Sequence, residues 1–367
     1  MTDISPAKRI GIVIAAIVAF ELIGLAFVSL GVKNLGYDFE AYLRGASRIL
    51  HGEPLYDVNV NVAGGFAIFL YPPPFGLAFA PFGLASRTFA LWQWESLLVA
   101  SLVTAIAILP VHKRIRWILL GLAVINWPVL YSILLGQVGM ILLLLFAAGW
   151  RWRDRPNVLG LTMATGALIK VQPVILLAWA GATGRWRAVA VAVVTLFAAV
   201  LIATVVFGPG VWADYLALLN RVNSSVTTPN GFSVGAILYQ NGVAEATART
   251  VQTATTIAVI AVVIVSIFRS SAEVSYLTTV VASQVLSPLV WDHYAVVLIL
   301  PIAWLLDRGH WWALGIMIVT SIPIVLYMPM AIYPVLFGIM LLGPLLAEAW
   351  DRRRAMNVTA NPAVGST

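Results

Sequence analysis

The chain has 367 residues, of which 61% are apolar and only 10% are charged. Soluble domains carry about 25% charged residues, so this composition excludes a cytosolic enzyme, a nucleic-acid-binding protein and a disordered chain. The absence of cysteine excludes disulfide bonds and thiol catalysis, and the four histidines show no metal-binding spacing. We therefore expect one polytopic, all-α membrane protein without a metal site.

The first predicted transmembrane span covers residues 10–32 and follows Lys8 and Arg9. About 20 apolar residues are enough to cross the hydrocarbon core of a bilayer, and this length favours a retained helix over a signal peptide. The polar segment 33–86 is expected to form a first outer loop, and its proline-rich part, 71–86, is expected to re-enter the membrane.

Apolar runs separated by charged or polar residues give the other predicted spans. They cover residues 89–110, 117–134, 137–150, 188–207, 250–268, 274–290, 295–306, 312–327 and 330–346. Two shorter runs, 158–169 and 171–182, are expected to form a hairpin with Lys170 at its tip. Together these segments predict about twelve transmembrane helices.

The distribution of charge predicts the orientation of the chain. Most of the 22 lysine and arginine residues fall on the side of the N-terminus, and such residues are enriched in cytoplasmic loops. Both termini are therefore placed in the cytoplasm, and the net charge of +7 reflects topology. The acidic residues on the outer side are Asp38, Glu40, Glu53, Asp57, Asp214, Glu245 and Asp292. One domain, 1–354, is expected, with a second outer loop at 208–248 and a disordered cytoplasmic tail at 355–367.

The first outer loop contains a segment with helical character, residues 39–50. One face is expected to carry Leu43, Ala46, Ile49 and Leu50, and another face Arg44 and Arg48. One interpretation is an interfacial amphipathic helix that is capped by Asp38. The alternative is that Asp38 is a general base that removes a proton from a sugar hydroxyl at the membrane surface.

Two further features have a structural and a functional interpretation. Three prolines follow Tyr71 and prevent a regular helix start, which fits either a stiff connection or the wall of a substrate cleft. Lys170 interrupts an apolar run, where a charge is costly and typically functional. It is suited to bind phosphate, and the alternative is a side chain that snorkels to the interface.

The segment 287–294 reads Ser-Pro-Leu-Val-Trp-Asp-His-Tyr and lies at an outer turn between two predicted spans. Because Asp292 and His293 are adjacent in sequence, we expect their side chains to diverge. The histidine can donate to a phosphate or a sugar oxygen. The alternative is an aromatic anchor at the membrane interface with a capping aspartate.

Five sequence blocks occur in a recognisable order. They are Asp38-Phe39-x-x-Tyr42 with Gly52-x-Pro54-x-Tyr56, Tyr71-Pro72-Pro73, Gly136-Gln137, Lys170-x-x-Pro173, and Ser287-Pro288-x-x-Trp291-Asp292-His293-Tyr294. In this order they resemble glycosyltransferase family 87, the polyprenol-phosphate-mannose-dependent mannosyltransferases with related arabinofuranosyltransferases. One departure follows Asn230, where Gly231 and Phe232 stand in place of the Gln-Ser that relatives often carry.

The resemblance implies a GT-C fold with outer-face amphipathic loop helices and an active site on the outer membrane face. It implies that Asp38 is the catalytic base, and that His293 is a catalytic residue that also binds the donor phosphate. Lys170 would be a further contact to this phosphate. The residues expected to bind substrates are Tyr42, Arg44, Tyr71, Gln137, Gln172, Asn230, Asp292 and Tyr294.

The resulting prediction is a multi-pass enzyme of a bacterial plasma membrane that transfers a sugar, with mannose the first choice, and inverts its anomeric centre. Its partners would be a polyprenyl-phosphate sugar donor, a glycolipid or lipid-linked glycan acceptor and membrane lipids, with no nucleic acid. No cofactor is expected, because the lipid-phosphate sugar is a substrate. Two alternatives are an arabinofuranosyltransferase and a non-enzymatic lipid or sugar flippase, although a flippase does not explain the acid-rich helical loop.

Overall fold

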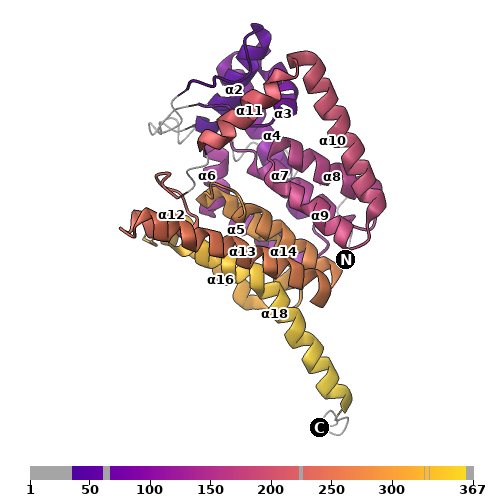
Figure 1. Ribbon diagram of the computed structural model, residues 1–367. Coiled ribbons are helices and arrows are strands. Elements are labelled where there is room, and N and C mark those ends of the chain that lie inside the picture. The colour runs from indigo at the N-terminus through magenta and orange to yellow at the C-terminus, as the bar shows by residue number, and fades with distance from the viewer. Residues whose placement is uncertain (1–34, 61–66, 223–225, 326, 330, 361–367) are drawn as a thin grey trace.

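The computed structural model describes residues 35–60, 67–222, 226–325, 327–329 and 331–360 (Figure 1). These residues form helices and no β-strand, which confirms the predicted all-α class. The first predicted span, residues 10–32, lies outside them.

The helices follow one another without a repeated pattern of lengths. The first half of the chain contains α2 (Tyr37–Leu50), α3 (Pro73–Phe79), α4 (Arg87–Ile108), α5 (Lys113–Ala123), α6 (Trp127–Leu135), α7 (Gly139–Arg151), α8 (Pro156–Ile169), α9 (Ile175–Ala182) and α10 (Trp186–Phe207). The second half contains α11 (Gly210–Val222), α12 (Val234–Gln240), α13 (Glu245–Arg269), α14 (Ala272–Val285), α15 (Ile299–Asp307), α16 (Leu314–Val319), α17 (Ile322–Val325) and α18 (Ile332–Ala360). Short 3₁₀ helices lie at η1 (Ala80–Leu84), η2 (Gln172–Val174), η3 (Asp292–Leu298) and η4 (Trp311–Ala313).

Four of the described helices are long and apolar enough to cross a membrane, namely α4, α10, α13 and α18. They coincide with the predicted spans at 89–110, 188–207, 250–268 and 330–346. The segment around Lys170, where a hairpin is expected, contains α8, η2 and α9, each of which is too short for a full span. The structure therefore supports an integral membrane protein, but these four helices do not by themselves confirm the predicted number of about twelve.

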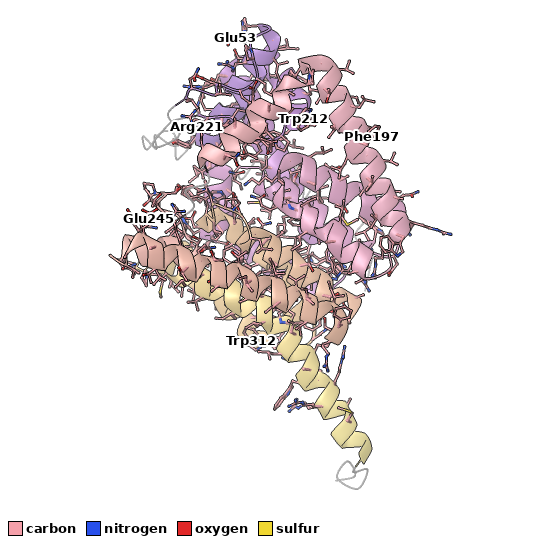
Figure 2. The ribbon with its side chains drawn as sticks, viewed as in Figure 1. Glu53, Phe197, Trp212, Arg221, Glu245 and Trp312 are labelled. Atoms are coloured by element: carbon pink, nitrogen blue, oxygen red, sulfur yellow. The ribbon has the colours of Figure 1, made fainter. Side chains whose placement is uncertain are left out.

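The outward faces of α10 and α13 suit a lipid environment. Only 11% of the apolar window of α10 and 17% of that of α13 are buried inside the protein. Val194 and Phe197 are each 68% exposed, and Phe197 points away from the body of the molecule (Figure 2). Such a continuous apolar face is unfavourable in water and favourable in hydrocarbon.

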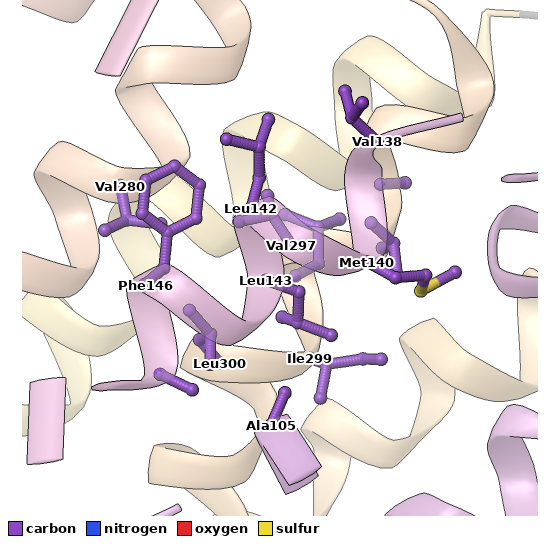
Figure 3. Close-up of a cluster of buried hydrophobic side chains, with 14 of the residues drawn as sticks. Ala105, Val138, Met140, Leu142, Leu143, Phe146, Val280, Val297, Ile299 and Leu300 are labelled. Atoms are coloured by element: carbon purple, nitrogen blue, oxygen red, sulfur yellow. The ribbon is translucent and has the colours of Figure 1, made fainter. Parts of the chain in front are cut away.

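The core is formed where α7 crosses between α4 and the C-terminal helices. Met140, Leu142, Leu143 and Phe146 of α7 are almost fully buried, and they pack among Ala105, Val280, Val297, Ile299 and Leu300 (Figure 3). Small side chains permit some of the closest approaches: a Cβ on Gly149 would lie 2.3 Å from the hydroxyl of Tyr276. This packing forms the hydrophobic core on which the remaining helices pack.

At one end of the molecule, α11 from the predicted second outer loop packs against α3, close to the predicted first outer loop, whereas α12 from the same second loop packs on α13 (Figure 1). The rings of Tyr56 and Tyr215 stack with centroids 5.4 Å apart. Arg221 at the end of α11 donates to the carbonyl oxygens of Val58 and Val60. Segments far apart in sequence thus pack together at this end of the molecule.

Two predicted spans are broken into shorter helices. The run 117–134 divides into α5 and α6, and the run 312–327 divides into α16 and α17. Each second half has a proline as its second residue, Pro128 or Pro323, and proline is favoured in the first turn of a helix. The sequence pattern of hydropathy could not reveal these breaks, because proline leaves the run apolar.

A polar cluster at the N-terminal end of α14 joins three helices. The carboxylate of Glu273 accepts hydrogen bonds from the indole of Trp150 at 2.7 Å, the indole of Trp304 at 3.1 Å and the guanidinium of Arg308 at 3.2 Å. Both tryptophans are almost fully buried, so loss of the carboxylate leaves two buried N–H groups without their acceptor.

We expect Glu273→Ala to lower the free energy of unfolding by about 2–3 kcal/mol, because each buried donor that loses its acceptor costs about 1–3 kcal/mol. Thermal unfolding of the detergent-solubilised protein measures this change. The control is Glu245→Ala, which removes an exposed pair with Arg249 and should have little effect. Equal stability of the two variants would contradict the structural role of Glu273.

The C-terminal boundary differs from the prediction. The helix α18 continues to Ala360 and projects from the body of the molecule (Figure 1). The segment expected as a disordered tail from residue 355 is therefore helical over its first six residues, 355–360. The reason is that Arg352, Arg353 and Arg354 are good helix formers and do not stop a helix that is already formed.

Candidate functional site

The helix predicted in the first outer loop is present as α2, and it begins one residue before Asp38. Gly36 is the N-cap residue, with φ of 73°, and Asp38 lies inside the first turn. Capping of α2 by Asp38 is therefore wrong. A carboxylate in this first turn still interacts favourably with the helix dipole.

The buried face of α2 consists of Phe39, Ala41, Tyr42, Gly45 and Ala46. The predicted face is thus right for Ala46, but Leu50 is 42% exposed. Tyr42 decides the orientation, because its ring contacts Phe75, Phe79 and Trp94 at centroid distances of 5.3–5.8 Å. These three aromatic side chains therefore orient the face of α2 that carries Asp38 and Tyr42 towards the interior.

Gln137 is the centre of a hydrogen-bond network on this interior side. Its amide nitrogen donates to Asp38 Oδ2 at 2.7 Å. Its amide oxygen accepts from the hydroxyls of Tyr42 at 3.1 Å and Tyr71 at 3.2 Å, and from the backbone N–H of Val138 at 2.9 Å. Because the backbone donor fixes the amide oxygen, the amide nitrogen must face the carboxylate. Four predicted site residues are thus brought together.

Burial raises the pKa of Asp38 above its usual range, and it is the largest effect on this carboxyl. The positive charges of His293 and Lys170 and the hydrogen bond from Gln137 act in the opposite direction and lower the pKa. The net result is a carboxylate that accepts a proton more readily than an exposed aspartate. Lys170 Nζ also lies 6.0 Å from the centre of the Tyr71 ring, and the Tyr71 hydroxyl shares Gln137 with Asp38, so Lys170 lies close to this carboxylate.

Lys170 lies at the tip of the predicted hairpin, immediately after α8. Its ammonium group donates to the hydroxyl of Tyr294 at 3.0 Å and lies 4.1 Å from the centre of that ring. Gln172 donates to Ser287 Oγ at 2.8 Å. Both contacts join the segment 170–173 to the segment 287–294, so two of the recognised sequence blocks meet here.

His293 and Asp292 are close to each other, which corrects the expectation that they diverge. Asp292 Oδ1 accepts the backbone N–H of His293 at 2.8 Å and lies 3.5 Å from His293 Nδ1. The side chain of Asp292 folds back onto the next residue because η3 begins here and its first N–H needs an acceptor. His293 is 4% exposed, and neither ring nitrogen has a hydrogen-bond partner among the described residues.

Two predicted substrate-binding residues lie at the margin of this group. Asn230 is exposed and has a φ of 58°, in the left-handed region. Its loop is held near the site by the backbone N–H of Phe232, which donates to the carbonyl of Val290 at 2.8 Å. Arg44 is exposed, and it lies about 120° around α2 from Asp38, at 100° per residue. Arg44 therefore faces away from the other site residues.

Two residues at the site were not predicted from the sequence. The indole of Trp127 donates to Asp292 Oδ2 at 2.8 Å. The ring of Tyr131 lies 6.1 Å from that of His293. Both belong to α6, and in the sequence they are hidden within an apolar run in which aromatic residues are common. The useful signal is the Asn-Trp-Pro sequence at 126–128, which is typical of a helix start.

The arrangement combines a carboxylate with groups that can carry positive charge on the facing segments. Asp38 is suited to accept a proton, and Lys170 and His293 are suited to bind an anionic oxygen. In the described ranges, no three histidine, aspartate or glutamate side chains converge as they would around a metal ion. Asp38, Lys170 and His293 can supply acid–base and electrostatic chemistry.

Comparison with known proteins gives one match. The model of glycosyltransferase family 87 matches residues 69–291, which include Tyr71, Gln137, Lys170 and Gln172. Asp38 precedes the matched segment, and His293 follows it by two residues. No curated protein and no solved structure matches the chain. The matched segment covers more than half of the chain, and the protein is therefore a member of glycosyltransferase family 87.

Proposed function

We propose that this membrane glycosyltransferase transfers a sugar, mannose in the first instance, from a polyprenyl-phosphate donor to a glycolipid or lipid-linked glycan. The observation that carries the proposal is the position of Asp38. It is held by Gln137, its pKa is raised by burial, and it lies within reach of the charges of Lys170 and His293. A proton acceptor opposite two potential phosphate ligands is the arrangement that this reaction needs.

In the proposed reaction the acceptor hydroxyl oxygen attacks the anomeric carbon while the bond from that carbon to the phosphate oxygen breaks. Asp38 takes the proton of the hydroxyl. The leaving polyprenyl phosphate becomes a monoester with an additional negative charge, which Lys170 and His293 stabilise. Attack from the face opposite to the phosphate inverts the centre, so a β-linked donor gives an α-linked product.

Several contacts fit this division of roles. His293 is buried, and its ring nitrogens make no hydrogen bond to the described residues, so they retain their hydrogen-bonding capacity. Lys170 uses one donor on Tyr294 and retains others, since an ammonium group has three. The hydroxyl oxygens of Tyr42 and Tyr71 lie 2.9 Å apart beside Gln137 and Asp38, and their lone pairs can accept from sugar hydroxyls. The site would face the outer side of a bacterial plasma membrane, with both termini in the cytoplasm.

The test is incubation of the purified protein with radiolabelled polyprenyl-phosphate mannose, or the corresponding arabinose compound, and a membrane glycolipid fraction. Covalent transfer of label from the mannose donor supports the proposal. Transfer only from the arabinose donor would identify an arabinofuranosyltransferase. Movement of the donor across reconstituted vesicles without transfer would identify a flippase and overturn the proposal.

Lys170→Met should raise the KM for the donor about ten-fold, because it removes one charged contact to the phosphate, worth roughly 1.4 kcal/mol. The KM for the acceptor should not change. Initial rates at varied donor concentration measure the effect. Lys113→Met is the control, because Lys113 is exposed at the start of α5 and is not one of the proposed site residues. An unchanged donor KM would remove Lys170 from the proposed phosphate site.

A further inference from the structure

The short helix α6 contacts the segments of both proposed catalytic residues, one at each end. It has nine residues, Trp127–Leu135, which corresponds to a length of about 13 Å at 1.5 Å per residue. Because all its backbone hydrogen bonds are local, a helix of this length is a stiff element. Its ends therefore hold the segments that they contact at a fixed separation.

The N-terminal end of α6 holds the segment of His293. Trp127 donates to Asp292 Oδ2, while Asp292 Oδ1 accepts the backbone N–H of His293. One turn further along α6, the ring of Tyr131 lies against the ring of His293 and also stacks on Trp127 at 4.8 Å. The imidazole is thus positioned through Asp292 and directly by an aromatic contact.

The C-terminal end of α6 holds the segment of Asp38. Gly136 ends the helix with a φ of 67°, and a Cβ at this position would lie only 2.7 Å from that of Phe39. The backbone N–H of Gly36 donates to the carbonyl of Leu134 at 2.7 Å, which joins α2 to α6. Gln137 follows directly and donates to Asp38.

The N-terminal end of α6 is itself anchored to a second helix break. The N–H of Trp127 donates to the carbonyl of Thr320 at 2.8 Å, and the N–H of Ile322 donates to the carbonyl of Ile125 at 2.9 Å. The amide of Asn126 donates to Thr320 Oγ1 at 2.7 Å, and its oxygen accepts the N–H of Val129. The two breaks thus satisfy each other's backbone groups, as an apolar environment requires.

We propose that α6 is a rigid spacer that sets the separation of Asp38 and His293, and that Trp127 is a positioning residue that acts through Asp292. The catalytic roles of Asp38 and His293 rest on the proposed function, whereas the positioning of His293 does not. Trp127 contacts Asp292 through one hydrogen bond and Tyr131 through its ring. A single substitution can remove the hydrogen bond and keep the ring contact.

The experiment uses Trp127→Phe, which deletes the indole N–H and retains an aromatic ring against Tyr131. The control is Trp117→Phe in α5, where the tryptophan is 44% exposed. The first readout is the rate at which diethyl pyrocarbonate acylates His293, measured by mass spectrometry. Its background carries three substitutions at the other histidines, His51→Gln, His112→Gln and His310→Gln. This readout depends on no substrate.

We expect Trp127→Phe to increase the rate of acylation of His293 several-fold, with the melting temperature unchanged. It should also lower kcat/KM for transfer from radiolabelled polyprenyl-phosphate mannose about 10–100-fold, as loss of an outer positioning contact typically does. In a double-mutant cycle with Asp292→Asn, the two effects should be strongly non-additive, because both act through one contact. Trp117→Phe should change neither quantity.

The outcomes separate this proposal from the proposed function. An unchanged rate of acylation in Trp127→Phe would overturn the positioning role, even if the enzyme transfers mannose. Additive effects of Trp127→Phe and Asp292→Asn would also overturn it. A faster acylation together with unchanged transfer would support the positioning of His293 and instead contradict its catalytic role.

Discussion

Asp38→Asn should abolish most of the sugar transfer while leaving the protein folded. Asparagine is nearly isosteric and can still accept the hydrogen bond from Gln137, but it cannot take a proton from the acceptor. Loss of a general base typically costs about 10²–10⁴-fold in rate. The measurement is the rate of label transfer at saturating donor, with donor binding measured separately.

The matched control is Glu40→Gln, two residues along the same helix. Glu40 pairs with Arg87 at 2.8 Å near the surface and faces away from Gln137. This variant should keep normal transfer. Near-normal transfer by Asp38→Asn, or an equal loss in both variants, would exclude Asp38 as the base.

The raised pKa of Asp38 gives this variant a signature in stability as well. A carboxyl whose pKa is higher in the folded than in the unfolded protein destabilises the fold once pH rises through the folded pKa. Asp38→Asn removes that cost, so its melting temperature at neutral pH should equal or exceed that of the unmodified protein. In the unmodified protein, transfer should fall with decreasing pH at a higher pH than an exposed aspartate would give.

His293→Ala should reduce kcat for the polyprenyl-phosphate donor by about 10²–10³-fold, the usual effect of removing one donor that stabilises developing negative charge. The acceptor KM should remain the same. His293→Gln, which retains a donor, should recover part of the rate. Steady-state kinetics with each substrate varied in turn distinguish these effects.

His51→Ala is the control for His293→Ala. His51 follows α2, is exposed, and bonds through its ring only to the backbone and side chain of Ser47 among the described residues. Its replacement should leave kcat unchanged. If His293→Ala kept full activity, phosphate stabilisation at this position would be excluded.

The elements that the sequence could predict are those that depend on residues close together in the chain. Hydropathy identifies α4, α10 and α13 because each is a continuous apolar run. The position of Lys170 between two short helices follows from one charge inside an apolar segment. Asp38, Gln137 and the segment 287–294 belong to sequence motifs that a family shares, and this led us to expect them in one site.

The parts that could not be predicted depend on partners that are distant in sequence. The break before α6 is completed by Thr320, 194 residues further along the chain from Asn126. The role of Trp127 depends on a hydrogen bond to Asp292, 165 residues away. The proximity of Asp292 and His293 is local, but it depends on the start of η3, which hydropathy does not mark.

The pairing of the two helix breaks has a consequence for biosynthesis. While the chain is synthesised in order, the carbonyl of Ile125 and the N–H of Trp127 lack the partners that residues 320–322 later provide. Unpaired backbone groups in hydrocarbon are costly, so the position of α6 is not fixed during most of translation. Because α6 contacts the segments of both Asp38 and His293, we expect a chain shortened before residue 320 to lack the contacts that hold α6 beside them.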